Sequence, residues 1–419
     1  MQVKSIKIKN FRNYKIESVD FHCGKNIVIG ENAQGKTNLL EAVDLLSAGK
    51  SSRAGDDKEL IGWGSMHAGL ELVYESRNYD ETLSVEWMLK EPSVPGIGGR
   101  CQKIIKVNGV SQQSVKGLLG RLITVSFAST DLKILRGGPK FRRDWLDNIA
   151  MRLKPSFHDS ISSYTKSLMQ RNKLLKTLSE KGKLTVSDQD ELLVWDKQLA
   201  KYGTHIIKMR LKILSELLPV AELHQSALSG ASERLSIDYA FRAQEESGTD
   251  GSAQEEEHGE SGHDAPIKSM DELQLMEENE LAHLLLKLMK ERRWIELRRR
   301  QSLVGPHRDN LIFKLNGASA VNFASQGQQR SIVLALKLAE LARVQEHLGE
   351  TPVLLLDDVL SELDEKRAAL LLSVVTKEMQ TIMSTTHITS IEPGWLADGR
   401  LHTVSAGAIA SLALISPNL

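Results

Sequence analysis

Hydrophobic and polar residues alternate through the first third of the chain with the period of β-strands. In MQVKSIKIKNF, charged and apolar residues take turns, as in a strand with one buried face. Residues 26–29 are almost continuously apolar, which is typical of a strand buried on both faces. Asn108 and Gly109 predict a tight turn. The predicted strands are 3–8, 27–29, 69–74, 82–88, 103–107 and 122–127.

Helical spacing replaces this alternation after residue 140. Leucines recur every three or four residues in 155–179 and in 188–218, which predicts a hairpin of two long helices with Pro219 ending the second. Helical spacing returns in 270–300. The last third then alternates strand-like and helix-like segments, the pattern of an α/β domain. These segments are strands 311–315, 353–356 and 381–384 and helices 328–348 and 365–380.

The chain of 419 residues is therefore expected to contain three parts. Residues 1–139 and 301–419 are α/β in pattern, and 140–300 form a smaller, mainly helical lobe. Segment 244–266 interrupts that lobe. It holds eight acids, no Lys or Arg and no apolar side chain of the size of valine or larger, so we expect a disordered acidic insert. Residues 91–100 are rich in turn formers.

Composition changes this picture in two respects. The net charge is zero, but without the eight acids of the insert the remainder is near +8, which favours an anionic partner. The two cysteines, Cys23 and Cys101, predict neither disulfides nor a zinc site, and His258 and His263 are not expected to bind metal. Neither an export signal nor an apolar run of membrane-spanning length is evident, so a cytoplasmic protein without membrane contact is expected.

The strongest chemical signal is GENAQGKT at residues 30–37, placed between a predicted strand and a predicted helix. Two glycines let successive backbone N–H groups face one side, toward phosphate oxygens at the helix N-terminus. Lys36 is expected to reach the β- and γ-phosphates, and Thr37 to offer its hydroxyl to Mg²⁺. The expected ATP contacts here are Gly30, Glu31, Asn32, Ala33, Gln34, Gly35, Lys36 and Thr37.

A second half of an ATP site follows from PVLLLDD, a buried strand that ends in two acids. Carboxylates at the C-terminal end of such a strand face the crevice where phosphates bind. Asp357 is expected to hold the Mg²⁺ shell. Asp358 is expected to act as the general base for the attacking water. Capping of the following helix is the alternative role for this pair.

Three further segments could complete the site. SQGQQR places Ser325, Gly327 and Gln328 at a helix N-terminus, a second anion site that one ATP could use only from a partner molecule. SELD contributes Asp364. STTHI contributes His387, which could contact a γ-phosphate or water. A plain helix cap and an ordinary loop histidine are the alternatives for the first and the last.

The order of these motifs resembles that of ABC-type ATPases of the chromosome-maintenance and DNA-repair branch, and within it the RecF family. The resemblance covers nearly the whole chain. One departure is FASTDL at 127–132, where the family usually has Pro and Glu before the Asp. The resemblance implies an ATPase head with a short helical lobe and no long coiled coil. Its other matching segments are NFRNY at 10–14, DKELI at 57–61, LRGGPKFRRDWLD at 135–147, QRNKLLK at 170–176 and GPHRDNL at 305–311.

The resemblance also implies a function. Such proteins bind ATP, Mg²⁺ and duplex DNA beside single-strand gaps, dimerise on ATP with each signature segment completing the partner's site, and hydrolyse ATP slowly. They act with RecO and RecR to help RecA load. A transporter nucleotide-binding subunit and a non-hydrolysing structural homologue are the alternatives. Basic clusters give the expected DNA contacts: Arg136, Lys140, Arg142, Arg143, Arg292, Arg293, Arg298 and Arg299, with Lys287, Lys290 and Arg300 nearby.

Overall fold

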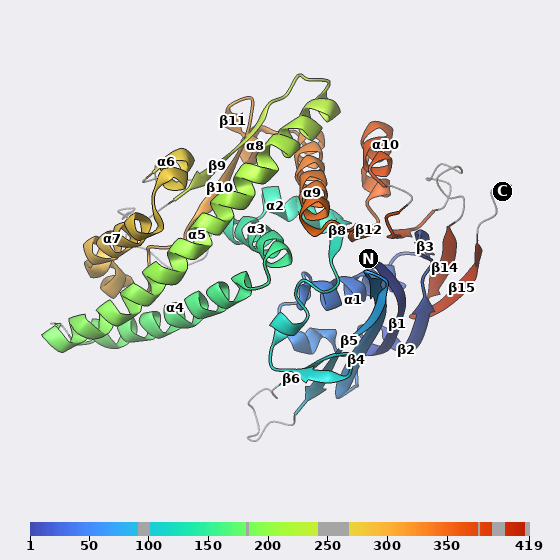
Figure 1. The fold of residues 1–419 in the computed structure, drawn as a ribbon, viewed down its shortest axis with the longest axis horizontal. Helices are drawn as coiled ribbons and strands as arrows, with labels where there is room; N and C mark the ends of the chain where they lie inside the picture. Colours follow the sequence, from blue (N-terminus) through green and yellow to red (C-terminus); the bar gives the residue numbers. More distant parts are fainter. Residues whose placement is uncertain (91–100, 182–183, 242–267, 376–377, 388–398, 415–419) are drawn as a thin grey trace. The chain divides into compact units, whose positions relative to one another are not determined.

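The computed structural model describes residues 1–419 except 91–100, 182–183, 242–267, 376–377, 388–398 and 415–419 (Figure 1). It divides the chain into two compact units, one of residues 1–131 with 337–419 and one of residues 132–336. The predicted boundaries fell at 139/140 and 300/301, so the second unit is longer than predicted and includes the SQGQQR segment. The acidic insert 244–266 and the patch 91–100 lie outside the described residues.

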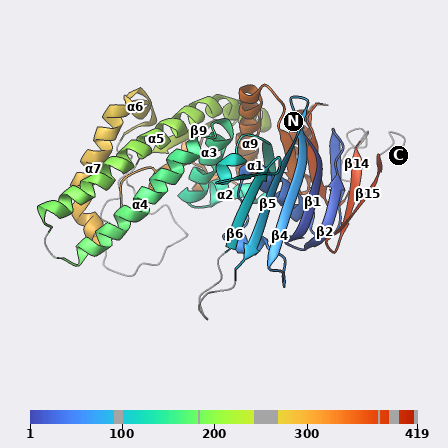
Figure 2. The same cartoon turned by 60° about the horizontal axis from the view of Figure 1, so that its bottom comes forward.

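The first sheet of the first unit is antiparallel, with strand order β2-β1-β4-β5-β6-β7 (Figure 2). Apolar residues at alternate positions give it one buried face, as in β4, where Ala68, Leu70, Leu72 and Tyr74 are buried. The predicted Asn108–Gly109 turn joins β6 to β7 in register. The bounds are β1 Gln2–Phe11, β2 Tyr14–Asp20, β4 His67–Ser76, β5 Tyr79–Leu89, β6 Cys101–Val107 and β7 Val110–Gln112.

The second sheet of this unit is mostly parallel, with strand order β15-β14-β3-β13-β12-β8. Its strand β12 is apolar on both faces, and Val353, Leu354, Leu355 and Leu356 are all buried, as expected for a central parallel strand. The β14–β15 hairpin was not predicted. The bounds are β3 Lys25–Ile29, β8 Thr124–Ala128, β12 Val353–Asp357, β13 Thr381–Thr385, β14 Arg400–Ser405 and β15 Ala408–Leu414.

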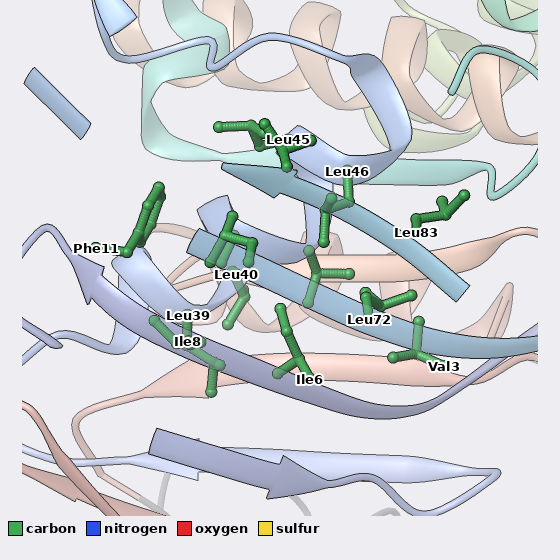
Figure 3. Packing of buried hydrophobic residues seen from close by; sticks show 14 of the residues in the cluster. Val3, Ile6, Ile8, Phe11, Leu39, Leu40, Leu45, Leu46, Leu72 and Leu83 are labelled. Carbon is green, nitrogen blue, oxygen red and sulfur yellow. The ribbon is translucent and has the colours of Figure 1, made fainter. Parts of the chain in front are cut away.

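Helix α1 (Lys36–Ala48) packs with both sheets in one hydrophobic core. Figure 3 shows four of its leucines beside side chains of β1, β4 and β5. The C-terminal ends of β3 and β12 and the N-terminal end of α1 carry the candidate nucleotide residues, so this core fixes their backbone. Shorter helices complete the unit: η1 Asp57–Leu60, η2 Val115–Gly117, η3 Ser129–Leu132, η4 Leu360–Glu362 and α10 Glu365–Ser373.

The second unit is mainly helical, with a three-stranded sheet of order β11-β10-β9. Helices α4 and α5 lie side by side as the predicted hairpin (Figure 1). Helix α9 begins in this unit and continues into the first. The bounds are α2 Lys133–Arg136, α3 Pro139–Leu153, α4 Phe157–Ser179, α5 Val186–Ser229, β9 Leu235–Ala240, α6 Met270–Leu275, α7 Glu278–Arg299, β10 Asn310–Leu315, β11 Ala318–Ser319, α8 Ala320–Phe323 and α9 Gln326–Leu348.

The prediction that Pro219 ends the long helix is wrong. Helix α5 contains Pro219 and continues to Ser229, ending at Gly230 in the left-handed conformation. A proline inside a helix removes one backbone hydrogen bond, but packing on both sides can offset that loss. Leu217 before it and Ala221 after it are both buried, so the apolar face of the helix runs through the proline.

The helical spacing predicted over residues 270–300 corresponds to two helices, α6 and α7. Lys208 of α5 donates from Nζ to the carbonyls of Leu273, Gln274 and Met276, which satisfies the end of α6. Glu277 then starts α7 in a capping box with Glu280. Helix α10 also ends earlier than predicted, at Ser373. In the part of the chain that the structure describes, no helix is long and apolar enough to cross a membrane.

Candidate nucleotide-binding site

The loop between β3 and α1 has a shape that only glycine allows at two positions. Gly35 has φ 125°, and a Cβ there would lie 2.8 Å from the Asn13 Nδ2 atom. A Cβ on Gly30 would lie 2.3 Å from the Val404 carbonyl oxygen. Because Ala33 also has a positive φ, the backbone curls before the N-terminus of α1, as an anion-binding loop requires.

Neighbouring side chains hold this loop on its outer side. Asn13 Nδ2 donates to the Gln34 carbonyl over 2.8 Å, and Tyr14 Oη donates to the Gly35 carbonyl over 2.9 Å. The Ala406 N–H donates to Gln34 Oε1 over 2.5 Å. Since these bonds occupy carbonyl oxygens, the loop keeps its N–H groups for an anion at the start of α1.

Lys36 is 5% exposed, and its ammonium lies within the curl of the loop. Its Nζ donates to the Gly30 carbonyl over 2.7 Å and to the Glu31 carbonyl over 3.0 Å. Two neutral carbonyls leave the positive charge uncompensated by a carboxylate at these contacts. A phosphate oxygen would supply that charge, so the geometry fits the predicted role of Lys36.

Thr37 and Asp357 come together although 320 positions separate them in sequence. Thr37 Oγ1 donates to Asp357 Oδ1 over 2.9 Å, and Ser384 Oγ donates to the same oxygen over 2.8 Å. A hydroxyl and a carboxylate are the hard oxygen ligands that Mg²⁺ uses beside nucleotide phosphates. The described residues contain no group of three or more His, Cys, Asp or Glu arranged for a metal ion, so an ion here would depend on phosphate and water oxygens as well.

Asp358 follows directly and differs from Asp357 in its surroundings. Its backbone adopts φ 53°, and its N–H donates to Ser384 Oγ over 2.9 Å. Its Oδ1 atom is buried, and no described residue hydrogen-bonds to it. A buried carboxylate oxygen without a partner is costly unless something pairs with it. A water held for attack on a phosphate would do so, and the predicted general-base role therefore fits.

A cavity of about 170 Å³ adjoins the Thr37–Asp357 pair. Its walls include Asp44 of α1, Arg53, Ser126 of β8, and Ser129 and Thr130 of η3. Arg53 Nη1 donates to Asn38 Oδ1 over 3.1 Å and to Glu41 Oε2 over 3.3 Å.

Glu41 is the centre of an ionic network that the sequence did not indicate. It is 6% exposed, and Arg12 donates to it from Nε over 3.1 Å and from Nη2 over 2.6 Å. Arg12 belongs to the segment NFRNY, which resembles the family. An Arg and an Asn directly after a strand do not by themselves indicate a contact with α1, so the sequence could not predict this network.

The signature residues Ser325, Gly327 and Gln328 belong to the second unit, at the start of α9. Ser325 and Gln328 form a capping pair: Gln328 N donates to Ser325 Oγ over 3.3 Å, and Ser325 N donates to Gln328 Oε1 over 2.7 Å. The structure therefore shows the helix cap that was the alternative interpretation of this segment. It does not exclude an anion-binding role, which stays a prediction.

Two other predicted site residues have local roles. Asp364 caps α10, since its Oδ1 accepts from the Arg367 N–H over 2.9 Å. His387 is exposed, and its N–H donates to Thr385 Oγ1 over 3.2 Å. Both nucleotide roles stay predictions.

The candidate DNA-binding residues differ in exposure. Arg142 is 3% exposed and donates to the carbonyls of Ile134 and Leu135 and to Asn310 Oδ1. A buried guanidinium cannot reach a phosphate backbone, so the structure contradicts the prediction for Arg142. Arg143 and Arg293 are half-buried, and Arg293 Nη2 pairs with Asp196 over 2.7 Å. Lys140, Arg136 and Arg298 are exposed.

Comparison with known proteins identifies the class to which this fold and site belong. The family model described as the RecF/RecN/SMC N terminal domain matches residues 2–397. A solved Smc head, bound to the C-winged helix domain of ScpA, is 14% identical with a TM-score of 0.50 and covers 99% of this chain and 98% of its own, which is a likeness of fold alone. The fold is thus a mixed α/β ATPase head with a helical lobe.

The nearer relatives are more specific. A DNA replication and repair protein RecF from Thermosynechococcus vestitus is 39% identical over 98% of both chains, and one from Gloeobacter violaceus is 36% identical over 98% of this chain and 99% of its own. A solved structure of the recombination mediator protein RecF-ATP in the RecFOR pathway is 31% identical, covers 98% of both chains and has a TM-score of 0.81. The chain belongs to the RecF family of DNA replication and repair proteins.

Proposed function

We propose that this protein is an ATP-dependent DNA-binding protein of recombinational repair and replication restart. Two copies close on ATP and bind duplex DNA beside single-strand gaps, and slow hydrolysis releases them. By analogy with the recombination mediator structure of the RecFOR pathway, it would act with RecO and RecR in the cytoplasm to help RecA load. The observation that carries the proposal is the junction of Thr37, Asp357 and Ser384, beside Asp358, whose buried Oδ1 has no hydrogen-bond partner among the residues that the structure describes.

The chain's own groups divide the work of the ATP site. The loop N–H groups and Lys36 bind the triphosphate, and Thr37 and Asp357 hold Mg²⁺, which neutralises phosphate charge when bound. Asp358 holds and orients a water at its buried oxygen and accepts its proton. Ser325 and Gly327 of one copy would contact the nucleotide held by the other. The half-site in one chain is then incomplete, which makes ATP a bridge between copies.

The bridge links nucleotide and DNA through electrostatics. Each copy carries exposed cations on its second unit, and two copies together present more positive charge to a phosphate backbone than one does. Binding without base contacts depends on salt and little on sequence. Hydrolysis splits ATP into ADP and phosphate, and when the phosphate leaves, the bridge loses negative charge, so the copies separate and the DNA is released.

Two substitutions test this proposal. Lys36→Ala is expected to abolish ATP binding and ATP-dependent dimerisation, because the ammonium in the phosphate loop is lost. Asp358→Asn keeps the shape but removes the proton acceptor, so it should bind ATP, hydrolyse it at least about 100-fold more slowly, and remain as a dimer on DNA. Asp80→Asn, at an exposed position of the same unit, is the charge-matched control.

Sedimentation with ATP, ADP or no nucleotide measures the dimer, and phosphate release with and without gapped DNA measures hydrolysis. Normal turnover by Asp358→Asn would show that Asp358 is not the base. A wild-type chain that stays monomeric and binds DNA equally with and without ATP would contradict the clamp. Binding of ATP without any turnover would indicate the non-hydrolysing homologue instead.

A further inference from the structure

The signature segment is held by a carboxylate from outside its own helix. Glu233 lies between α5 and β9 and is half-buried. Its Oε1 accepts a hydrogen bond from Gln328 Nε2 over 2.8 Å. Its Oε2 accepts one from Gln225 Nε2 over 2.7 Å. One side chain thus connects the signature segment to the long helix α5.

These contacts fix which way the Gln328 amide points. A carboxylate only accepts hydrogen bonds, so the NH₂ group of Gln328 must face Glu233. The Ser325 backbone N–H only donates, so the amide oxygen must face it, over 2.7 Å. With both ends of the amide assigned, Gln328 holds the Ser325 backbone in a single arrangement.

The same arrangement orients the Ser325 hydroxyl. Its oxygen accepts from the Gln328 N–H over 3.3 Å, and no described residue accepts the hydroxyl proton at hydrogen-bonding distance. The Gln328 N–H therefore fixes the Ser325 Oγ atom, and the hydroxyl proton is left to donate to another group. This is the state in which a serine can donate to a phosphate oxygen.

The anchor behind Glu233 is rigid. Gln225 is fully buried in α5, so its amide has little freedom to follow a moving carboxylate. On the other side of the segment, Arg136 Nε donates to Gln329 Oε1 over 2.6 Å, and Gln329 Nε2 donates to the Ala324 carbonyl over 3.0 Å. The two consecutive glutamines of SQGQQR are thus held by different residues, Gln328 by Glu233 and Gln329 by Arg136.

We infer that Glu233 is a positioning residue for ATP hydrolysis, which holds Gln328 and Ser325 so that Ser325 meets the nucleotide bound by a second copy of the chain. This inference rests on the proposed ATP-bridged dimer. Glu233 acts through Gln328 and touches no nucleotide itself. Its loss should therefore damage the site in the partner molecule and leave ATP binding by its own phosphate loop intact.

Glu233→Gln is the direct test. The substitution keeps the shape, but its NH₂ group must face either Gln225 or Gln328, both of which present a donor. We expect hydrolysis to fall about tenfold, as for loss of one charge-assisted hydrogen bond, with nucleotide affinity of the isolated chain unchanged. Glu222→Gln, in α5 close to Gln225 in sequence, removes the same charge and should leave hydrolysis unchanged.

Mixing variants separates positioning from a general folding defect. Lys36→Ala binds no ATP but keeps its signature segment, whereas Glu233→Gln binds ATP but presents a weakened one. In a mixed dimer, the ATP of Glu233→Gln meets the intact segment of Lys36→Ala, so the mixture should hydrolyse ATP faster than either variant does alone. A misfolded Glu233→Gln chain could not recover in this way.

A second mixture calibrates the first. Ser325→Arg blocks the signature segment directly, so Ser325→Arg with Lys36→Ala should also recover hydrolysis. If the mixture of Ser325→Arg with Lys36→Ala recovered hydrolysis but the mixture of Glu233→Gln with Lys36→Ala did not, the positioning role of Glu233 would be wrong, and the proposed dimer would stand. Failure of both mixtures would overturn the shared dimer site and, with it, this inference. Normal hydrolysis by Glu233→Gln alone would also contradict it.

Discussion

Charged groups at the nucleotide edge of the first unit have few partners within the chain, whereas those in the interior of the second unit are paired. At the nucleotide edge, the partners of Lys36 among the described residues are two carbonyls, and no described residue hydrogen-bonds to the buried Oδ1 of Asp358. In the second unit, Arg171 is fully buried yet donates to Asp196, Glu296 and Ser302 over 2.7–2.8 Å. Charge that a ligand is to neutralise is left open, and charge that holds the fold is paired within the chain.

A second paired group lies near the first. Arg210 donates to both oxygens of Asp147 over 2.7 and 2.8 Å and to the Pro306 carbonyl over 2.7 Å. Tyr239 Oη donates to Asp309 Oδ2 over 2.6 Å. Four residues of the two groups come from segments that resemble the family: Asp147 from FRRDWLD, Arg171 from QRNKLLK, and Pro306 and Asp309 from GPHRDNL. These segments therefore have a structural role in the second unit, and a family motif is not by itself a ligand contact.

The largest expected effect on stability comes from removing a cation from the paired region of the second unit. Arg171→Met leaves Asp196 and Glu296 buried without their shared cation, and each is at most 1% exposed. Removing one partner of a buried ion pair costs about 3–5 kcal/mol, so the free energy of unfolding should fall by that amount. Urea unfolding followed by circular dichroism measures it.

Lys287→Met is the control for Arg171→Met, since Lys287 is 72% exposed in its pair with Glu291. Exposed pairs contribute little, so its midpoint should stay near that of the wild type. If both variants lost the same stability, the buried cluster would have no special role. ATP binding by Arg171→Met should be retained below its unfolding midpoint, because the phosphate loop lies in the other unit.

The sequence could predict the phosphate loop because that site is local. Gly30, Gly35, Lys36 and Thr37 lie within eight consecutive residues, and the strand and helix around them have clear patterns. Asp357 could be added because a buried strand ending in acids has few alternatives once the loop is known. Strands β1 and β4 were predicted for the same reason, since alternation is strong in both, whereas β2, β7 and the β14–β15 hairpin were not predicted.

The paired groups could not be predicted, because their partners are distant in sequence. Arg171 is separated from Asp196 by 25 positions, from Glu296 by 125 and from Ser302 by 131. Spacing along one helix shows only that a residue is charged, and the usual inference for a charged helix residue is exposure. That inference failed for Arg142. Pro219 misled for a related reason, since tertiary packing outweighed a local helix breaker.

The second prediction concerns how the stability of the nucleotide-binding unit depends on pH. Asp131 follows Ser129 and Thr130, which line the cavity, in the short helix η3. Burial raises the pKa of its carboxyl from 3.8 to about 6, although nearby Lys337 and the Ala128 N–H oppose this. Glu340 and Asp44 raise the pKa further. The folded protein then holds a proton between pH 4 and 6 that the unfolded chain has lost.

The sign follows from that proton. The stabilising contribution is complete below pH 4 and is lost as the pH rises through 6, so over this window the free energy of unfolding should fall by about 2 kcal/mol. Asp131→Asn keeps an acceptor for the Ala128 N–H and removes the titration. Its stability should exceed that of the wild type at pH 7.5 and approach it at pH 4. Parallel pH curves for the two proteins would show that Asp131 ionises normally.

The smallest effect tests whether single hydrogen bonds in the paired region matter. His307 Nε2 lies 3.1 Å from the Ser302 carbonyl, which can only accept, so this nitrogen carries the proton and Nδ1 accepts from Tyr164 Oη over 2.7 Å. Burial lowers the pKa of His307 to about 3, in keeping with a neutral ring. The nearby Gly305 leaves room for this bond, since a Cβ there would lie 2.3 Å from Tyr164 Oη.

Tyr164→Phe removes the donor and leaves Nδ1 buried without a partner, so it should cost about 1–2 kcal/mol. Tyr79→Phe is the control, because Tyr79 is 76% exposed and its hydroxyl is available to water. Urea unfolding distinguishes the two. The Tyr164→Phe variant should also keep wild-type nucleotide affinity, since its defect is confined to the paired region. A loss of affinity at unchanged stability would mean that the second unit's polar interior tunes the nucleotide edge, and the division between open and paired charge would then be too sharp.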